Sequence, residues 1–228
     1  MKKLIFTITI ITALFATSLS QDFVEVDMKD IESKTTDSLS YLYYPILLDR
    51  YMSFDSTLTI DDYKYLYYGY VFTDMYNPYG SHEQENEFYN LYYEGNYEEA
   101  LPIGEQIFLD NPINTKLVFK LLVCHHQIKN LENAEKYSLL YYGLLRIIYF
   151  SGDGESVETA FKVITVSDEY EILSELGLKS TGQALIGTCD RLSIEKSSQD
   201  VEKGEKKIKE LFFDVSLAFE YLNKQYEN

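Results

Sequence analysis

The chain has 228 residues, of which 20 are basic and 37 acidic, so its formal net charge is −17. So strong a negative charge repels the phosphate backbone of nucleic acids and anionic lipid headgroups, which argues against both as partners. The hydrophobic content of 46% is enough to build a folded core and argues against intrinsic disorder.

Residues 1–20 have the pattern of a secretory signal peptide. Lys2 and Lys3 provide a basic start, the run 4–15 carries no charge, and small residues precede a cleavage site before Gln21. The apolar run is shorter than the roughly 20 residues of a membrane-spanning helix, and no cysteine near the cleavage site offers a lipid anchor. The sequence therefore predicts an exported protein, periplasmic or secreted, whose mature chain has no membrane span.

Three helices are predicted before a turn cluster at residues 77–80. The first is polar and covers 27–37, and the second begins at Tyr44-Pro45, because proline suits the first position of a helix. Thr59, followed by Asp62 three residues later, resembles a capping box at the start of the third. Behind it an apolar and aromatic stripe recurs at spacings of three and four, which is more typical of a core-facing helix side than of a ligand site: Ile60, Tyr63, Leu66, Tyr67, Tyr70 and Val71.

The clearest internal repeat relates segments 95–100 and 129–134, which lie 34 residues apart. Each combines residues that interrupt a helix, then an apolar residue, an acidic residue and an alanine. Each therefore predicts the corner of a helical hairpin. Residues 83–148 resemble two tetratricopeptide repeats, whose period is also 34 residues. About three units normally make a stable array, so we expect the preceding helices to complete the stacking.

The repeat resemblance has visible departures. Phe88 and Leu122 stand where the repeat normally has a small residue that allows close helix crossing. Gly104 and Ser138 stand where a ring normally packs. The sequence alone does not show how these exchanges are accommodated.

After residue 150 the pattern predicts a small α+β unit, because strand-like runs replace the helical period. The expected elements are a strand at 160–166, a helix at 167–176, a second strand or bent pair at 183–195, a charged turn at 197–207, a strand through 211–215 and a helix at 217–226. The predicted fold class is α+β, mainly α. Tetratricopeptide-like hairpins fill 21–150, and a small antiparallel sheet with short helices fills 151–228.

A second resemblance rests on the runs 66–70, 159–163, 167–170 and 212–215. They are similar to an exported bacterial family, domain of unknown function 4919. This resemblance covers nearly the whole mature chain and implies export and a shared architecture. It implies no activity, because none is assigned to the family.

A search for catalytic or metal-binding residues assigns none. Cys124, His125 and His126 are the densest set of metal-ligating residues, but neighbours on a helix point about 100° apart, so an exposed histidine beside a buried cysteine and a packed histidine is the preferred interpretation. The chain has three histidines, no Gly-x-Ser-x-Gly elbow and no glycine-rich phosphate loop, so we expect no cofactor. Acidic pairs such as Glu98-Glu99 open predicted helices, where negative charge is stabilising.

The two cysteines, Cys124 and Cys189, leave two alternatives open. In an oxidising compartment they would be able to form a disulfide bond. Both also lie in apolar runs, where an unpaired cysteine behaves as a small hydrophobic residue. The choice depends on the distance between the two cysteines in the folded chain.

The leading hypothesis is a binding module that presents a groove to a protein or an extended peptide. In tetratricopeptide arrays the first helix of each unit lines the inner face, and that resemblance selects Tyr89 and Tyr92 from the first unit and Lys116, Phe119, Val123 and His126 from the second. The alternatives are a hydrolase of envelope peptide or glycan with an acidic dyad still to be located, and a structural protein that associates with itself. The sequence does not indicate the oligomeric state.

Overall fold

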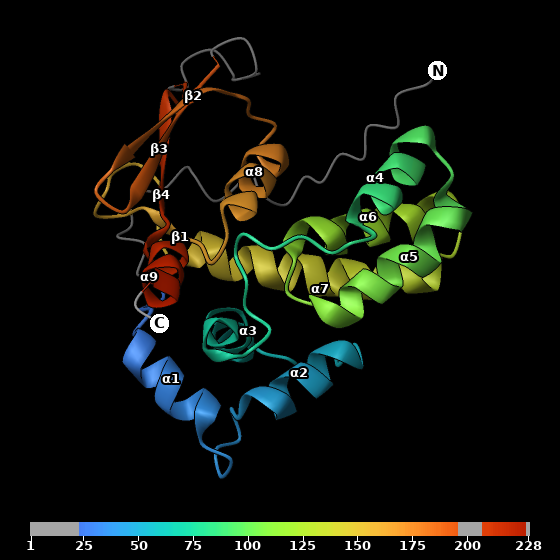
Figure 1. Ribbon diagram of the computed structural model, residues 1–228, viewed down its shortest axis with the longest axis horizontal. Helices are drawn as coiled ribbons and strands as arrows, with labels where there is room; N and C mark the ends of the chain where they lie inside the picture. The colour runs from blue at the N-terminus through green and yellow to red at the C-terminus, as the bar shows by residue number, and fades with distance from the viewer. Residues whose placement is uncertain (1–22, 196–206, 227–228) are drawn as a thin grey trace.

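The computed structural model describes residues 23–195 and 207–226 (Figure 1). The predicted signal peptide and the predicted charged turn, apart from Lys207, lie outside these residues. The helices are α1 (Met28–Thr36), α2 (Tyr44–Met52), α3 (Ile60–Gly69), the 3-10 turn η1 (Tyr70–Phe72), α4 (Glu85–Glu94), α5 (Tyr97–Asp110), α6 (Thr115–Gln127), α7 (Leu131–Phe150), α8 (Val166–Glu175) and α9 (Ser216–Tyr226). The strands are β1 (Phe161–Lys162), β2 (Ser180–Ile186), β3 (Cys189–Ile194) and β4 (Glu210–Asp214).

The predicted class, α+β and mainly α, is confirmed. The sheet has the order β1-β4-β3-β2, and the predicted second strand or bent pair is the β2–β3 hairpin, whose turn contains Gly187 at φ 63°. The sheet is mixed rather than purely antiparallel, because β1 runs parallel to β4. A parallel pair needs a long connection, and α8 together with the β2–β3 hairpin supplies it.

The helices α4 to α7 form two antiparallel hairpins that stack through α5 and α6. Each predicted corner contains a residue in the left-handed backbone region, Gly95 at φ 84° and Lys129 at φ 63°. The amide of Asn96 donates to the carbonyl of Leu91, and that of Asn130 donates in the same way to His125. These bonds satisfy carbonyls at the helix ends that the helix itself leaves unpaired.

The structure accounts for one departure from the repeat pattern. Phe88 of α4 is fully buried, and its ring lies against Gly104 of α5. A Cβ atom on Gly104 would lie 2.5 Å from Cε2 of Phe88 and 2.8 Å from Cδ2 of Leu121. The small residue has therefore moved from one helix to its neighbour, and the close crossing is kept.

We expect Gly104→Ala to lower the free energy of unfolding by about 1–3 kcal/mol, because overpacking a close crossing costs this much and exceeds the gain in helix propensity. Urea unfolding followed by circular dichroism measures the loss. Phe88→Leu in the same chain frees space for the new methyl group, so the double variant should lose less than the sum of the two single variants. Additive losses would contradict the contact between Phe88 and Gly104.

Tyrosines of α3 connect the helical hairpins with the C-terminal unit. The hydroxyl of Tyr63 donates to the carbonyl of Leu139 in α7 at 3.3 Å, and that of Tyr67 donates to Asp168 in α8 at 2.7 Å. Figure 1 shows α3 between α1 and α2 on one side and α7 on the other. The predicted stripe on this helix is therefore core, as we expected, and each buried hydroxyl keeps a hydrogen-bond acceptor.

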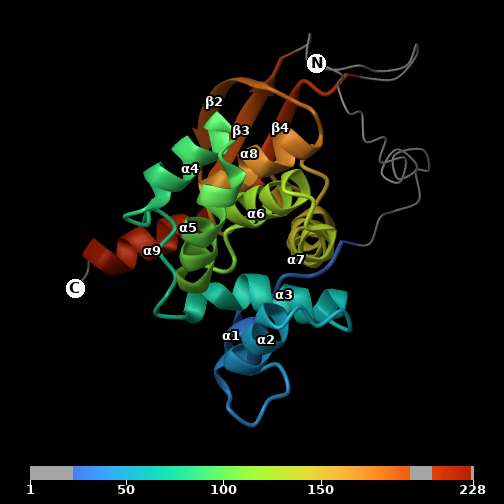
Figure 2. The ribbon, with the colours of Figure 1, turned by 90° about the vertical axis from the view of Figure 1, so that its right-hand side faces the viewer.

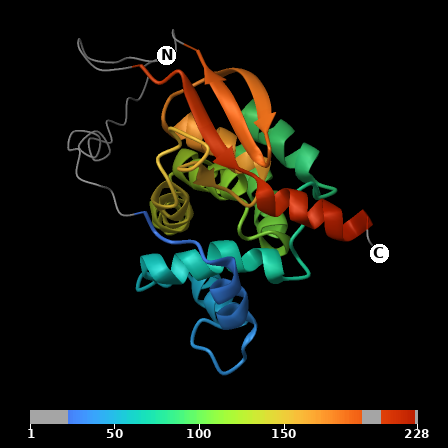
Figure 3. The ribbon, with the colours of Figure 1, turned by 90° about the vertical axis from the view of Figure 1, so that its left-hand side faces the viewer.

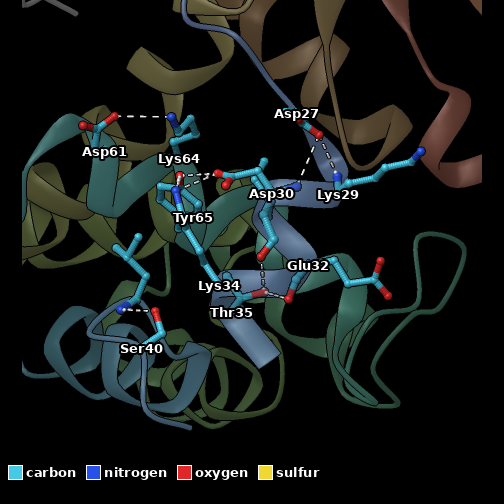
Figure 4. A network of polar contacts seen from close by, with 12 residues as sticks. Asp27, Lys29, Asp30, Glu32, Lys34, Thr35, Ser40, Asp61, Lys64 and Tyr65 are labelled. Carbon is cyan, nitrogen blue, oxygen red and sulfur yellow. Dashed lines mark hydrogen bonds and ion pairs between the residues drawn. The ribbon is translucent and has the colours of Figure 1, made fainter. Parts of the chain in front are cut away.

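A polar network fastens α1 to α3 (Figure 4). The hydroxyl of Tyr65 donates to Asp30 at 2.6 Å, and the ammonium group of Lys34 lies 3.0 Å from both groups. Lys64 adds a second cation 4.9 Å from the centre of the Tyr65 ring. The network is partly exposed, so it orients α1 more than it stabilises the fold.

One hydrophobic cluster extends across the predicted boundary at residue 150. The helix α7 ends at Phe150, and the ring of Tyr149 packs edge-on against Phe161 of β1 with centroids 5.7 Å apart. Ile148 on one side of the boundary and Phe213 on the other belong to the same set of buried residues. The two predicted units therefore share a core.

Candidate functional site

Most of the predicted binding residues meet on facing sides of α4 and α6. The ammonium group of Lys116 lies 4.3 Å from the centre of the Tyr89 ring, and that of Lys120 lies 4.9 Å from the centre of the Tyr92 ring. Such contacts are cation–π interactions. We call this surface the aromatic–lysine face; it consists of Tyr89, Tyr92, Tyr93, Lys116, Phe119 and Lys120.

The structure places the other two predicted residues differently. Val123 is half-buried on α6, and His126 is exposed at the end of the same helix. Among the described residues, neither takes part in the cation–π contacts that join α6 to α4. The selection from the sequence did not include Lys120. This residue lies one helical turn after Lys116, and the spacing of four residues was the available signal.

Helix α8 packs against α6 and brings carboxyl groups to the aromatic–lysine face. Figure 2 shows α8 beside α6, with α4 on the near side. Burial raises the pKa of Glu171, and the positive charges of Lys120 and Lys116 oppose that shift. Burial lowers the pKa of Lys120, and Glu171 opposes this shift in turn. The face thus combines rings with two cations and a buried carboxyl group.

Asp168 at the start of α8 joins three elements. Its carboxylate accepts hydrogen bonds from the hydroxyls of Tyr67 at 2.7 Å, Thr115 at 2.6 Å and Thr165 at 3.0 Å. Burial raises the pKa of Asp168, and these donors oppose the shift. Every oxygen is used within the protein, so the group holds α3, α6 and α8 together and offers no site to a ligand.

A second buried carboxyl group, Glu169, faces the sheet. Its side chain has no exposed surface, and burial together with the neighbouring Asp190 raises the pKa of Glu169 to about 9. Asp190 is 6% exposed and accepts a hydrogen bond from the side-chain amide of Gln183 at 2.6 Å. The pair is therefore closed off from solvent, and at neutral pH Glu169 holds its proton.

Two hollows of the surface lie away from the aromatic–lysine face. A groove of about 550 Å³ runs between α7 and the segment leading into α3, and its walls include Phe54, Leu58, Tyr63, Leu139 and Tyr142. A smaller hollow of about 220 Å³ lies between α1, η1 and α9. In the described part of the chain, the carboxyl groups whose pKa is raised overall all lie on α8 and line neither hollow.

The structure has the arrangement preferred from the sequence, an exposed histidine beside a buried cysteine and a packed histidine. Cys124 and Cys189 are both buried and free, so the disulfide alternative is not realised. The ring of His125 is buried and stacks on Tyr137, whereas His126 is exposed. Within residues 23–195 and 207–226, no group of three or more histidine, cysteine or acidic residues is placed to hold a metal ion.

None of the helices in the described segments has the length and hydrophobicity that a membrane span requires. No curated protein and no solved structure matches the chain. The resemblance of residues 83–148 to tetratricopeptide repeats therefore stays a prediction, although the hairpins themselves are present. A family model described as "Domain of unknown function (DUF4919)" matches residues 29–224, nearly the whole described chain. The chain therefore belongs to this family.

Proposed function

We propose that this protein is an exported binding module that takes a peptide or a protein segment on its aromatic–lysine face. The observation that carries the proposal is the position of two lysines over tyrosine rings that are only partly buried, in a chain whose net charge is −17. Tyrosine rings offer a large contact area at low entropic cost. The ammonium groups of Lys116 and Lys120 suit carboxylates, so acidic peptides are the expected ligand class.

The hydrolase alternative has a specific candidate in Glu169 and Asp190, because a protonated carboxyl group beside a second one is the arrangement that acid–base catalysis uses. The burial of this pair argues against catalysis. Glu169 has no exposed surface, and neither hollow includes it. A substrate would have no route to the pair, so binding is the better-supported function.

The proposal is tested by selecting peptides from a random phage-displayed library on the mature chain. Export is tested by expressing the full chain with residues 1–20, because N-terminal sequencing of protein recovered from the periplasm or medium should then begin at Gln21. Selected peptides should be acidic, and we expect Lys116→Glu to weaken their binding at least about tenfold in calorimetric titration, since a charge reversal at a ligand carboxylate costs well over 1 kcal/mol.

Two further variants make the test specific. Tyr93 is 69% exposed, so Tyr93→Ala should weaken binding without changing the thermal unfolding temperature. Lys136→Glu makes the same charge change on the exposed side of α7 and should bind like the wild type. If Lys116→Glu and Lys136→Glu weakened peptide binding equally, the loss would come from the change in net charge. The aromatic–lysine face would then not be the binding site.

A further inference from the structure

The strand β2 forms an outer edge of the sheet. Residues 182–186 pair with β3 on one side, and no strand of the described segments pairs with the other side. Figure 3 shows the β2–β3 hairpin in orange standing beside β4 in red. Unpaired N–H and C=O groups along such an edge are a template for another strand.

The edge carries no charge. Residues 180–188 contain no charged side chain, although charged residues make up 25% of the sequence. Leu185 is 53% and Ile186 is 42% exposed. Proteins commonly protect edge strands with charges, proline or a bulge, and β2 has only an irregularity between Ser180 and Gly182. The stretch 182–186 is left open to pairing.

We propose that β2 of a second copy of this chain pairs with this edge, antiparallel and centred on Ala184. Ile186 and Cys189 close a two-residue hairpin turn, so the backbone groups of Ala184 and Ile186 face β3 and those of Gln183 and Leu185 face outward. Pairing about Ala184 uses these outward groups over the longest open stretch. The two sheets then become one continuous sheet.

Side-chain fit favours a second copy as the occupant. In this register Ile186 of each copy lies opposite Gly182 of the other, on the same face of the sheet. A Cβ atom on Gly182 would meet nothing within 4 Å, so the space beside it is open to the large apolar side chain. A two-fold axis makes this contact twice.

The distribution of charge also favours pairing of two copies along β2. Two copies that each carry a net charge of −17 repel one another over most of their surface. The repulsion is smallest where both surfaces are neutral, which is the case along residues 180–188. Five residues from each chain form a small interface, so the association is weak and depends on concentration.

Cysteine cross-linking in the full mature chain tests the register. Ala184→Cys should form a covalent dimer under mild oxidation, because residues in the central non-hydrogen-bonded pair have Cα atoms about 4.5 Å apart. Leu185→Cys alone should cross-link poorly, yet it should cross-link when mixed with Gln183→Cys. The unsubstituted chain is the control for Cys124 and Cys189, which are buried. Cross-linking of Leu185→Cys in preference to Ala184→Cys would overturn the proposed pairing.

Light scattering across a concentration series tests the association itself. The wild-type mass should rise above that of the monomer with concentration, and Leu185→Glu, whose folding is checked by circular dichroism, should stay monomeric. A wild-type chain that is monomeric throughout, or a Leu185→Glu variant that associates equally well, would refute the proposal. The result is independent of the peptide-binding proposal, because β2 contributes no residue to the aromatic–lysine face.

Discussion

Replacing Asp168 with alanine is expected to lower the free energy of unfolding by about 3–5 kcal/mol, which is a large part of the total stability of a typical domain. The substitution leaves the hydroxyls of Tyr67 and Thr115 without their acceptor inside the protein. Unpaired buried polar groups cost roughly 1–3 kcal/mol each. The substitution also removes the Asp168 half of the capping box of α8, worth about 1 kcal/mol. Urea unfolding of the two proteins measures the difference.

The chain contains a matched control for this experiment. Asp62 closes a capping box with Thr59 at the start of α3, just as Asp168 does with Thr165 at the start of α8. Asp62 also pairs with Arg50 at 3.3 Å, but within the described segments it accepts no hydrogen bond from a distant hydroxyl. Asp62→Ala should therefore cost only about 1 kcal/mol. Similar losses for both variants would show that Asp168 acts as a cap alone and does not hold the three helices together.

Glu169→Gln is expected to make the protein more stable at alkaline pH. The folded pKa of Glu169 is about 9, above its ordinary value of 4.5, so the native state holds a proton that the unfolded state releases. The stability that this proton provides is complete below about pH 4.5 and is lost as pH rises towards 9. From about pH 5 to about pH 8 the loss should be on the order of 4 kcal/mol. Glutamine keeps the shape of the side chain and does not titrate.

Thermal unfolding of both proteins between about pH 5 and pH 9 checks this expectation. The unfolding temperature of the wild type should fall over this interval, and that of Glu169→Gln should fall less. Glu98→Gln makes the same side-chain replacement at an exposed position on α5, so it should keep the wild-type slope. Parallel curves for Glu169→Gln and the wild type would place the Glu169 side chain in contact with water.

Local signals in the sequence predicted the helices well. The capping box of Thr59 and Asp62 is present, and the breaks at Gly95 and Lys129 are helix corners. These features involve hydrogen bonds and backbone angles within a few residues, so the sequence contains all the partners. The parallel pairing of β1 with β4 was not predicted, because it joins Phe161 to Phe213 across a long segment.

The residues of the candidate site likewise include some that the sequence predicted and some that it did not. The resemblance to tetratricopeptide repeats selected Tyr89 and Tyr92 on α4 and Lys116 and Phe119 on α6, and the structure brings Lys116 over the ring of Tyr89. The spacing of four residues after Lys116 was the available signal for Lys120. No local pattern indicated Glu171, because the chain must pass through α7 and β1 before α8 returns to α6.

The sequence by itself determined the export prediction, the acidic charge, the capped helices and the aromatic stripe of α3, because each depends on neighbouring residues or on composition. Only the tertiary structure decided that Tyr67 would meet Asp168 across 101 residues, that Glu169 would be buried against Asp190, and that β2 would lie at the edge of the sheet. The physical reason is that burial and long-range pairing depend on how the elements pack, and packing brings together residues whose separation in the chain has no regular period.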